Sequence, residues 1–222
     1  MPFAQKSKLP VFRGAIFDLD GTLLNSMGIW SRIDEDFLGR RGIPVPPDYM
    51  DELAALGFRP AAEYTIKRFG FSESPEEIMA EWTAMAVEAY STGVSLKPHG
   101  REYLLYLKER GVKLAVATAS QEELFVPALR HNGVYELFDA VTTLKEVSRG
   151  KGWPDIYWKA AQKLGLRPEE CAVFEDIYAG VKGAKEGGFF TIGVDDPFSG
   201  YEKEKILATS DLYITNFSEL ME

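Results

Sequence analysis

Short, mostly apolar runs, separated by helix-length segments, are the main pattern of this chain. The runs are rich in Val, Ile and Phe and cover residues 14–19, 112–118, 140–143, 172–175, 190–194 and 212–215. None alternates apolar and polar positions as a half-exposed antiparallel strand does, which favours parallel strands covered on both faces. The segments between them carry apolar residues at helical spacing, for example Ile156, Ala160 and Leu164. The pattern predicts a doubly wound α/β fold, whose ligands bind beyond the carboxyl ends of the strands.

Residues 25–96 break this alternation, and their pattern predicts about four helices and no strand. The clearest helix is predicted over residues 75–92, with Pro75 early and Ile78, Trp82 and Met85 on one face. We therefore expect two domains: an α/β core of residues 1–24 and 97–222, and a helical insert of residues 25–96. Because the insert leaves directly after the first strand, we expect it to act as a lid over the carboxyl edge of the sheet.

Composition narrows the class of protein. The 222 residues are 45% hydrophobic and 27% charged, values typical of a globular chain. A net charge of −9 argues against a general nucleic-acid binder, and no apolar run approaches the roughly 18 to 20 residues that span a bilayer. Cys171 is the single cysteine and cannot form an internal disulfide. We expect a soluble cytoplasmic protein, a monomer or weak homodimer, with no nucleic-acid or membrane partner.

The segment from Phe17 to Leu23 carries the strongest chemical signal. Asp18 and Asp20 lie two positions apart at the end of a predicted buried strand, where carboxylates are costly unless something neutralises them. Bound Mg²⁺ would do so, since it prefers carboxylate and phosphate oxygens. Gly21 allows a sharp turn there. Taken alone, such an acidic pair is more often a strand end whose Asp residues cap a turn or helix.

The stretch Asp18-Leu19-Asp20-Gly21-Thr22 resembles motif one of the haloacid dehalogenase superfamily, whose phosphatases read DxDGT. Residues 116–120, 150–157 and 173–180 resemble the three other family motifs, in the expected order. The resemblance spans residues 12–216. It implies a Rossmann-like core with an inserted all-α cap, in the phosphatase and β-phosphoglucomutase-like branch.

The resemblance implies a role for each motif residue. Asp18 would be the nucleophile that forms an aspartyl-phosphate, and Asp20 would be the general acid/base. The Thr118 hydroxyl would bind a phosphate oxygen. Lys151 would offset the repulsion between Asp18 and the phosphate, although Gly152 departs from the usual Lys-Pro-x-Pro form of this motif.

The resemblance also implies a metal and a substrate site. Mg²⁺ would be held by Asp18, the backbone carbonyl of Asp20, Asp176 and Glu175, the last directly or through water. The substrate-binding residues would be Leu19, Gly21, Ala119, Arg59 and Trp30. Without the resemblance, Arg59 would be an exposed side chain and Trp30 a core aromatic residue of the insert.

These observations predict a Mg²⁺-dependent phosphatase acting on a small phosphorylated metabolite of the sugar phosphate or phosphoglycolate type. A first alternative is a β-phosphoglucomutase-like phosphomutase; such enzymes carry a His twelve residues after the nucleophile, where this chain has Trp30. A dehalogenase is disfavoured because it would not require the acid at Asp20. A non-catalytic binding protein that keeps the fold is the alternative from another class, but it would not need the nucleophile.

Overall fold

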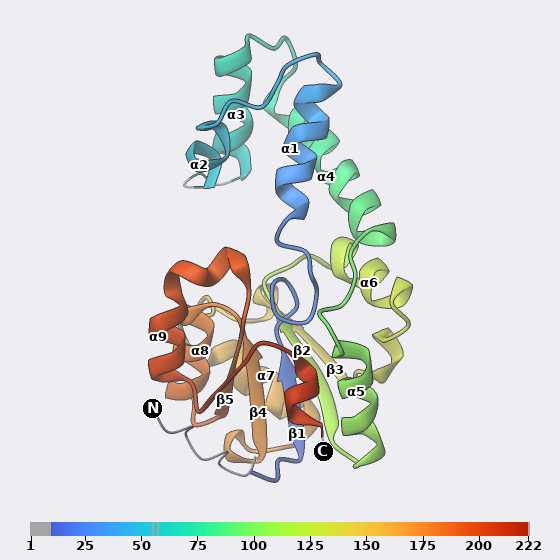
Figure 1. The fold of residues 1–222 in the computed structure, drawn as a ribbon, viewed down its shortest axis with the longest axis vertical. Coiled ribbons are helices and arrows are strands. Elements are labelled where there is room, and N and C mark those ends of the chain that lie inside the picture. The colour runs from blue at the N-terminus through green and yellow to red at the C-terminus, as the bar shows by residue number, and fades with distance from the viewer. Residues whose placement is uncertain (1–9, 55, 57, 222) are drawn as a thin grey trace. The chain divides into compact units, whose positions relative to one another are not determined.

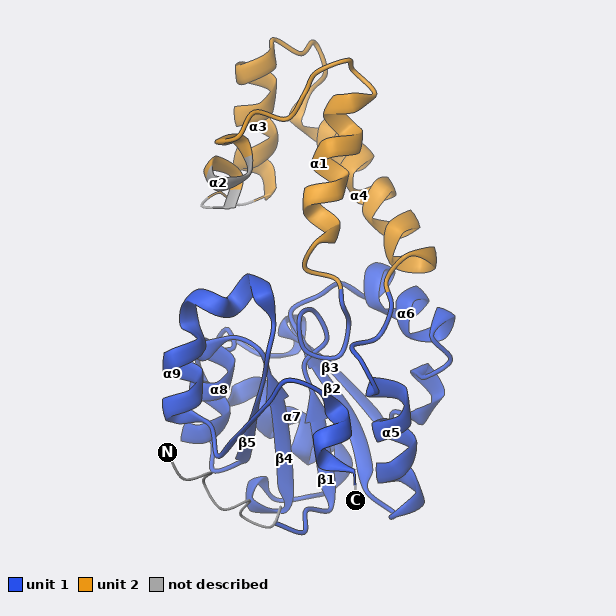
Figure 2. Ribbon diagram, in the orientation of Figure 1, with its two compact units in different colours: residues 1–25, 95–222 blue, residues 26–94 orange. Residues whose placement is uncertain are grey.

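The computed structural model describes residues 10–54, 56 and 58–221. They form two compact units, coloured separately in Figure 2. One comprises Met1–Asn25 with Ser95–Glu222, and the other comprises Ser26–Val94.

The first unit contains a six-stranded sheet in the order β3-β2-β1-β4-β5-β6, in which every neighbouring pair is parallel (Figure 1). The strands are β1 (Gly14–Phe17), β2 (Lys113–Thr118), β3 (Ala140–Thr143), β4 (Cys171–Glu175), β5 (Phe190–Val194) and β6 (Leu212–Ile214). The strand order reverses direction between β1 and β4. The predicted doubly wound α/β fold is confirmed, and the reversal places a ligand-binding position at the carboxyl ends of β1 and β4.

Helices cover both faces of this sheet. They are α5 (Gly100–Glu109), α6 (Glu122–His131), α7 (Asp155–Leu164), α8 (Tyr178–Glu186) and α9 (Lys203–Thr209), with short 3₁₀ turns η1 (Tyr135–Leu137), η2 (Leu144–Glu146), η3 (Pro168–Glu170), η4 (Pro197–Glu202) and η5 (Phe217–Leu220). Ile16 and Val173 pack with Ile156 and Ala184, residues of α7 and α8, on one face. On the other face Phe17 stacks on Phe174 beside residues of α5 and η5. Burial on both faces explains why central β1 is apolar throughout and why central β4 is apolar up to its last residue, Glu175.

The first strand ends earlier than its apolar run predicts. The run extends to Leu19, but β1 stops at Phe17. The Leu19 carbonyl accepts the backbone N–H groups of Thr22, Leu23 and Leu24, which folds the chain into a tight turn. The turn takes the hydrogen bonds that a longer strand would give to the sheet, so strand pairing ends two residues before the apolar run does.

The second unit is helical over its described residues. It contains α1 (Ile29–Gly39), α2 (Tyr49–Ala54), α3 (Phe58–Phe69) and α4 (Pro75–Thr92). The helix predicted over residues 75–92 is confirmed: Pro75 occupies its first turn, and Ser74 and Glu77 form a capping box at its start. Among the residues that the structure describes in either unit, no helix is long and apolar enough to cross a membrane.

Candidate active site

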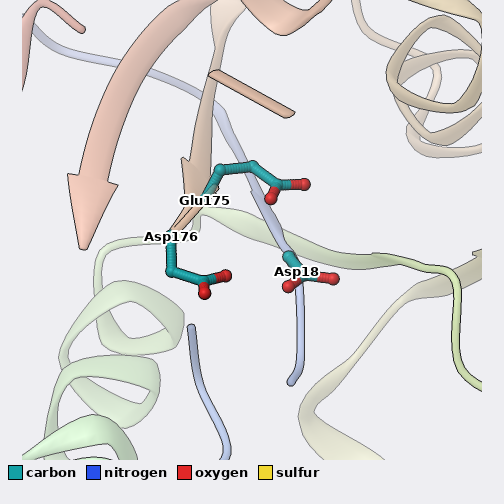
Figure 3. A group of neighbouring side chains, drawn as sticks. All are labelled: Asp18, Glu175 and Asp176. Carbon is teal, nitrogen blue, oxygen red and sulfur yellow. The ribbon is translucent and has the colours of Figure 1, made fainter. Parts of the chain in front are cut away.

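Three carboxylates meet at the carboxyl ends of the two central strands. Asp18 follows β1, Glu175 is the last residue of β4, and Asp176 follows it. One ligand oxygen from each lies within 4.8 Å of the others, and all three residues are buried. Figure 3 shows Glu175 and Asp176 extending from the end of one strand toward Asp18. Parallel pairing of β1 with β4 brings together residues that are far apart in the sequence.

Lys151 supplies the positive charge of this cluster. Its ammonium group forms an ion pair with Asp18 Oδ1 and lies 2.7 Å from Glu175 Oε1. The lysine side chain is only 8% exposed, so it belongs to the site and not to the surface. Three carboxylates against one ammonium leave two negative charges when all are ionised. A divalent cation would balance that charge.

Two buried oxygens of the cluster have no hydrogen-bond partner among the described residues: Glu175 Oε2 and Asp176 Oδ2. An unpaired buried polar atom costs about 1–3 kcal/mol, and more when it is charged. Oxygen atoms are also the ligands that Mg²⁺ prefers. The donor set, its net charge and these two bare oxygens all fit a divalent cation held by Asp18, Glu175 and Asp176.

Burial changes the acidity of the cluster. Burial and, to a smaller extent, the neighbouring carboxylate of Asp18 outweigh the opposing charge of Lys151, and together they raise the pKa of Glu175 to about 8 and the pKa of Asp176 to about 7. The pKa of Asp18 is also raised, because burial outweighs the attraction of Lys151. Burial lowers the pKa of Lys151, but the charges of Asp18 and Glu175 more than reverse this, so the lysine stays protonated. A bound dication would oppose the protonation of these carboxylates.

The turn after β1 is built around Gly21. Its φ of +82° lies in the left-handed region, and a Cβ at this position would overlap the Asp176 carboxylate. Glycine is therefore required both by the backbone and by the close approach of the acid. Asp20, one residue earlier, is half-buried, and its role as acid/base stays a prediction.

Thr118 ends β2 on the same edge of the sheet. It is buried, and its Oγ1 accepts the backbone N–H of Ser120 at 3.0 Å. That contact uses the oxygen as an acceptor and leaves the hydroxyl proton to be donated elsewhere. Ala119, between them, is exposed. The phosphate-binding role predicted for Thr118 and Ala119 is compatible with this geometry and remains a prediction.

Arg59 and Trp30 belong to the helical unit. Arg59 forms ion pairs with Glu63 and Glu76, and the Trp30 ring meets Phe58 edge-on at 6.0 Å between centroids. Both are partly exposed. Their predicted contact with substrate stays a prediction, as does that of Leu19, which is wholly buried and whose carbonyl holds the turn after β1.

Two contributors to the site were not singled out by sequence reasoning. The Thr22 hydroxyl donates to Asp176 Oδ1 at 2.8 Å and lies 3.2 Å from Asp18 Oδ2. The Tyr157 hydroxyl donates to Glu175 Oε1 at 2.7 Å. Both residues lie inside the motif segments, and that position could have pointed to them. Their hydrogen-bond partners could not be predicted, because they are 154 and 18 residues away in the sequence.

Comparison with known proteins shows the family to which this chain belongs. A sequence profile of the haloacid dehalogenase-like hydrolases matches residues 15–194. Hexitol phosphatase A of Escherichia coli (strain K12) is 32% identical over 188 residues, which cover 83% of this chain and 84% of that protein. Validoxylamine A 7'-phosphate phosphatase of Streptomyces hygroscopicus subsp. limoneus is 28% identical over 214 residues, covering 95% and 96%.

The solved structures include one of similar fold and size. A haloacid dehalogenase family hydrolase of Deinococcus radiodurans R1, determined with bound phosphate and sodium, matches with a TM-score of 0.73. It is 26% identical, and the match covers 95% of this chain and 93% of that one. The chain therefore belongs to the haloacid dehalogenase-like hydrolases and is an enzyme of the phosphatase type.

Proposed function

We propose that this enzyme hydrolyses a small phosphate monoester through an aspartyl-phosphate on Asp18, with Mg²⁺ as its metal. The observation that carries the proposal is the pair of bare oxygens on Glu175 and Asp176, beside Asp18 and its partner Lys151. The residues around Asp18 thus offer oxygens suited to a dication and, from Lys151, a buried ammonium group. A phosphate dianion needs positive charge of this kind around it.

The residues would divide the reaction into two displacements. In the first, an Asp18 carboxylate oxygen attacks phosphorus, the bond from phosphorus to the leaving oxygen breaks, and Asp20 gives that oxygen a proton. In the second, water attacks the aspartyl-phosphate, Asp20 takes a proton from the water, and the Asp18–phosphate bond breaks to release inorganic phosphate. Lys151 and Thr118 would bind the phosphoryl oxygens throughout. When bound, Mg²⁺ would supply charge stabilisation for the transferring group.

We propose a phosphorylated sugar or sugar alcohol as the substrate class. The name of hexitol phosphatase A supports this class, since the two chains align over most of their lengths. Arg59 and Trp30, in the helical unit, are the residues that we propose for contact with the organic part of the substrate. A cytoplasmic location and a monomeric or weakly dimeric state remain predictions.

A turnover screen tests the proposal. The purified protein is incubated with a panel of sugar phosphates, hexitol phosphates and phosphoglycolate, with Mg²⁺ or with excess chelator, and released phosphate is measured. We expect Mg²⁺-dependent release from at least one sugar or hexitol phosphate. Unchanged release in the presence of chelator would contradict the metal, and activity on phosphoglycolate alone would contradict the substrate class.

A further inference from the structure

The hydroxyl of Tyr157 contacts the acidic cluster from the core of the protein. Tyr157 lies on α7 and is fully buried. Its hydroxyl donates to Glu175 Oε1 at 2.7 Å. The ammonium group of Lys151 lies at 2.7 Å from the same oxygen. Oε1 therefore receives two donors, whereas Oε2 of the same carboxylate has none among the described residues.

The neighbouring carboxylate, that of Asp176, likewise has one oxygen that accepts a hydrogen bond and one that accepts none among the described residues. Asp176 Oδ1 accepts the Thr22 hydroxyl at 2.8 Å, and Asp176 Oδ2 is bare. A carboxylate oxygen has about two lone pairs, so Glu175 Oε1 is saturated by its two donors. The only oxygen of Glu175 with both lone pairs left for a cation is Oε2. Which oxygen is presented depends on the rotation of the carboxylate, and the donors on Oε1 set that rotation.

Of the two donors on Oε1, Tyr157 is the one that is dedicated to Glu175. Lys151 is shared with Asp18 and sits on a flexible four-carbon stem. The Tyr157 ring is buried in the hydrophobic core and packs edge-on against the Phe189 ring, at 6.2 Å between centroids. As a neutral donor, the phenol also orients the carboxylate without adding positive charge that would repel a cation.

We propose that Tyr157 is a positioning residue of the metal site, which orients the Glu175 carboxylate so that Oε2 faces the cation. The inference rests on the proposed function in one respect, that the cation is Mg²⁺. Groups that orient metal ligands in this way typically account for about 10- to 100-fold in metal affinity. We therefore expect the Tyr157 hydroxyl to contribute to the Mg²⁺ affinity within this range.

Direct metal binding tests the proposal. Tyr157→Phe removes the hydroxyl and keeps the ring. Metal-free wild type and variant are titrated with Mg²⁺ by calorimetry, and we expect the Kd of the variant to be about 10- to 100-fold higher. The loss of turnover should be larger at limiting Mg²⁺ than at saturating Mg²⁺. Tyr103→Phe is the matched control, because it deletes a buried phenolic hydroxyl on the opposite face of the sheet and should leave the Kd unchanged.

A double-variant cycle separates positioning from general disruption of the core. In a Glu175→Gln background, adding Tyr157→Phe should cause little further loss of Mg²⁺ affinity, since the carboxylate to be oriented is gone. A Kd for Tyr157→Phe within threefold of wild type, or losses that simply add in the double variant, would overturn the proposal. Wild-type protein that binds Mg²⁺ but hydrolyses no phosphate ester would overturn the proposed function and leave this inference standing.

Discussion

The ammonium group of Lys97 lies 2.5 Å from Oδ2 of Asp196, and the two side chains are only 10% and 1% exposed. Lys97 also donates from its side chain to the Asp195 carbonyl at 3.1 Å and from its backbone N–H to the Leu23 carbonyl. Lys97 is thus bound on one side to the turn after β1 and on the other to the loop after β5. This buried ion pair holds together two parts of the edge of the sheet where the carboxylates lie.

We predict that Lys97→Met destabilises the protein by about 3–5 kcal/mol, because it leaves the Asp196 carboxylate buried without its partner. The free energy of unfolding is measured by urea titration in metal-free buffer. Adding Asp196→Asn should recover most of the loss, since the amide is neutral and can still accept the Phe198 N–H that Asp196 Oδ1 accepts. A loss below about 1 kcal/mol, as for an exposed pair, would contradict the prediction.

Asp18→Asn should reduce phosphate release to background. The amide cannot act as the nucleophile that the carboxylate is proposed to be. The measurement is phosphate release at saturating Mg²⁺, together with a search for phosphorylated protein after rapid acid quenching of the wild type. Asp36→Asn, the same change on an exposed helix position, is the control and should retain wild-type turnover. An active Asp18→Asn variant would remove the basis of the mechanism.

Asp20→Asn should lower turnover by about 10²- to 10⁴-fold, the range of a lost general acid/base. Mg²⁺ binding should persist, because the proposed metal contact of this residue is its backbone carbonyl. Calorimetric titration with Mg²⁺ and steady-state kinetics distinguish the two effects. Turnover within threefold of wild type would show that Asp20 is not the acid/base.

Asp34 gives the helical unit a pH-dependent stability. Burial raises the pKa of its carboxyl from the ordinary value of 3.8 to about 6. A carboxyl whose folded-state pKa is raised contributes stability below its unfolded pKa and loses it as the pH rises through the folded value. Asp34→Asn should therefore match wild type below about pH 4, gain stability relative to wild type as the pH rises, and reach its full advantage above about pH 6.

Urea unfolding midpoints at about pH 3.5 and about pH 7.5, which lie on the two sides of this window, check the prediction. Asp36→Asn on the same helix is exposed and serves as the control. A gain that is equal at both pH values would show that the effect does not come from ionisation of Asp34.

Hydrolysis should prevail over phosphoryl transfer within a sugar. The position twelve residues after Asp18 is Trp30, whose indole donates one hydrogen bond but cannot exchange a proton near neutral pH. If a mutase cycle needs an ionisable group there, this chain lacks it. The protein is incubated with β-glucose 1-phosphate and a trace of the bisphosphate, and both products are followed. Glucose 6-phosphate forming much faster than inorganic phosphate would favour the mutase.

Local sequence patterns predicted the elements of the fold. A strand buried on both faces is mostly apolar, so β5, which is buried from its second residue on, has the bounds that its apolar run predicted. The helix over residues 75–92 was predictable for a similar reason, because its cap, its proline and its apolar face all lie within the segment itself. The end of β1 was not predictable in this way, since Leu19 is apolar but its carbonyl is used by the turn.

The sequence by itself determined that this chain forms a doubly wound α/β core with a helical insert, and that acidic residues follow two of its strands. Only the tertiary structure decided which carboxylate oxygens of those residues accept hydrogen bonds and which have no partner among the described residues. The Thr22–Asp176, Tyr157–Glu175 and Lys97–Asp196 contacts join residues 154, 18 and 99 positions apart. Such contacts depend on the order of the strands and on how closely their ends approach, and no local pattern encodes either quantity.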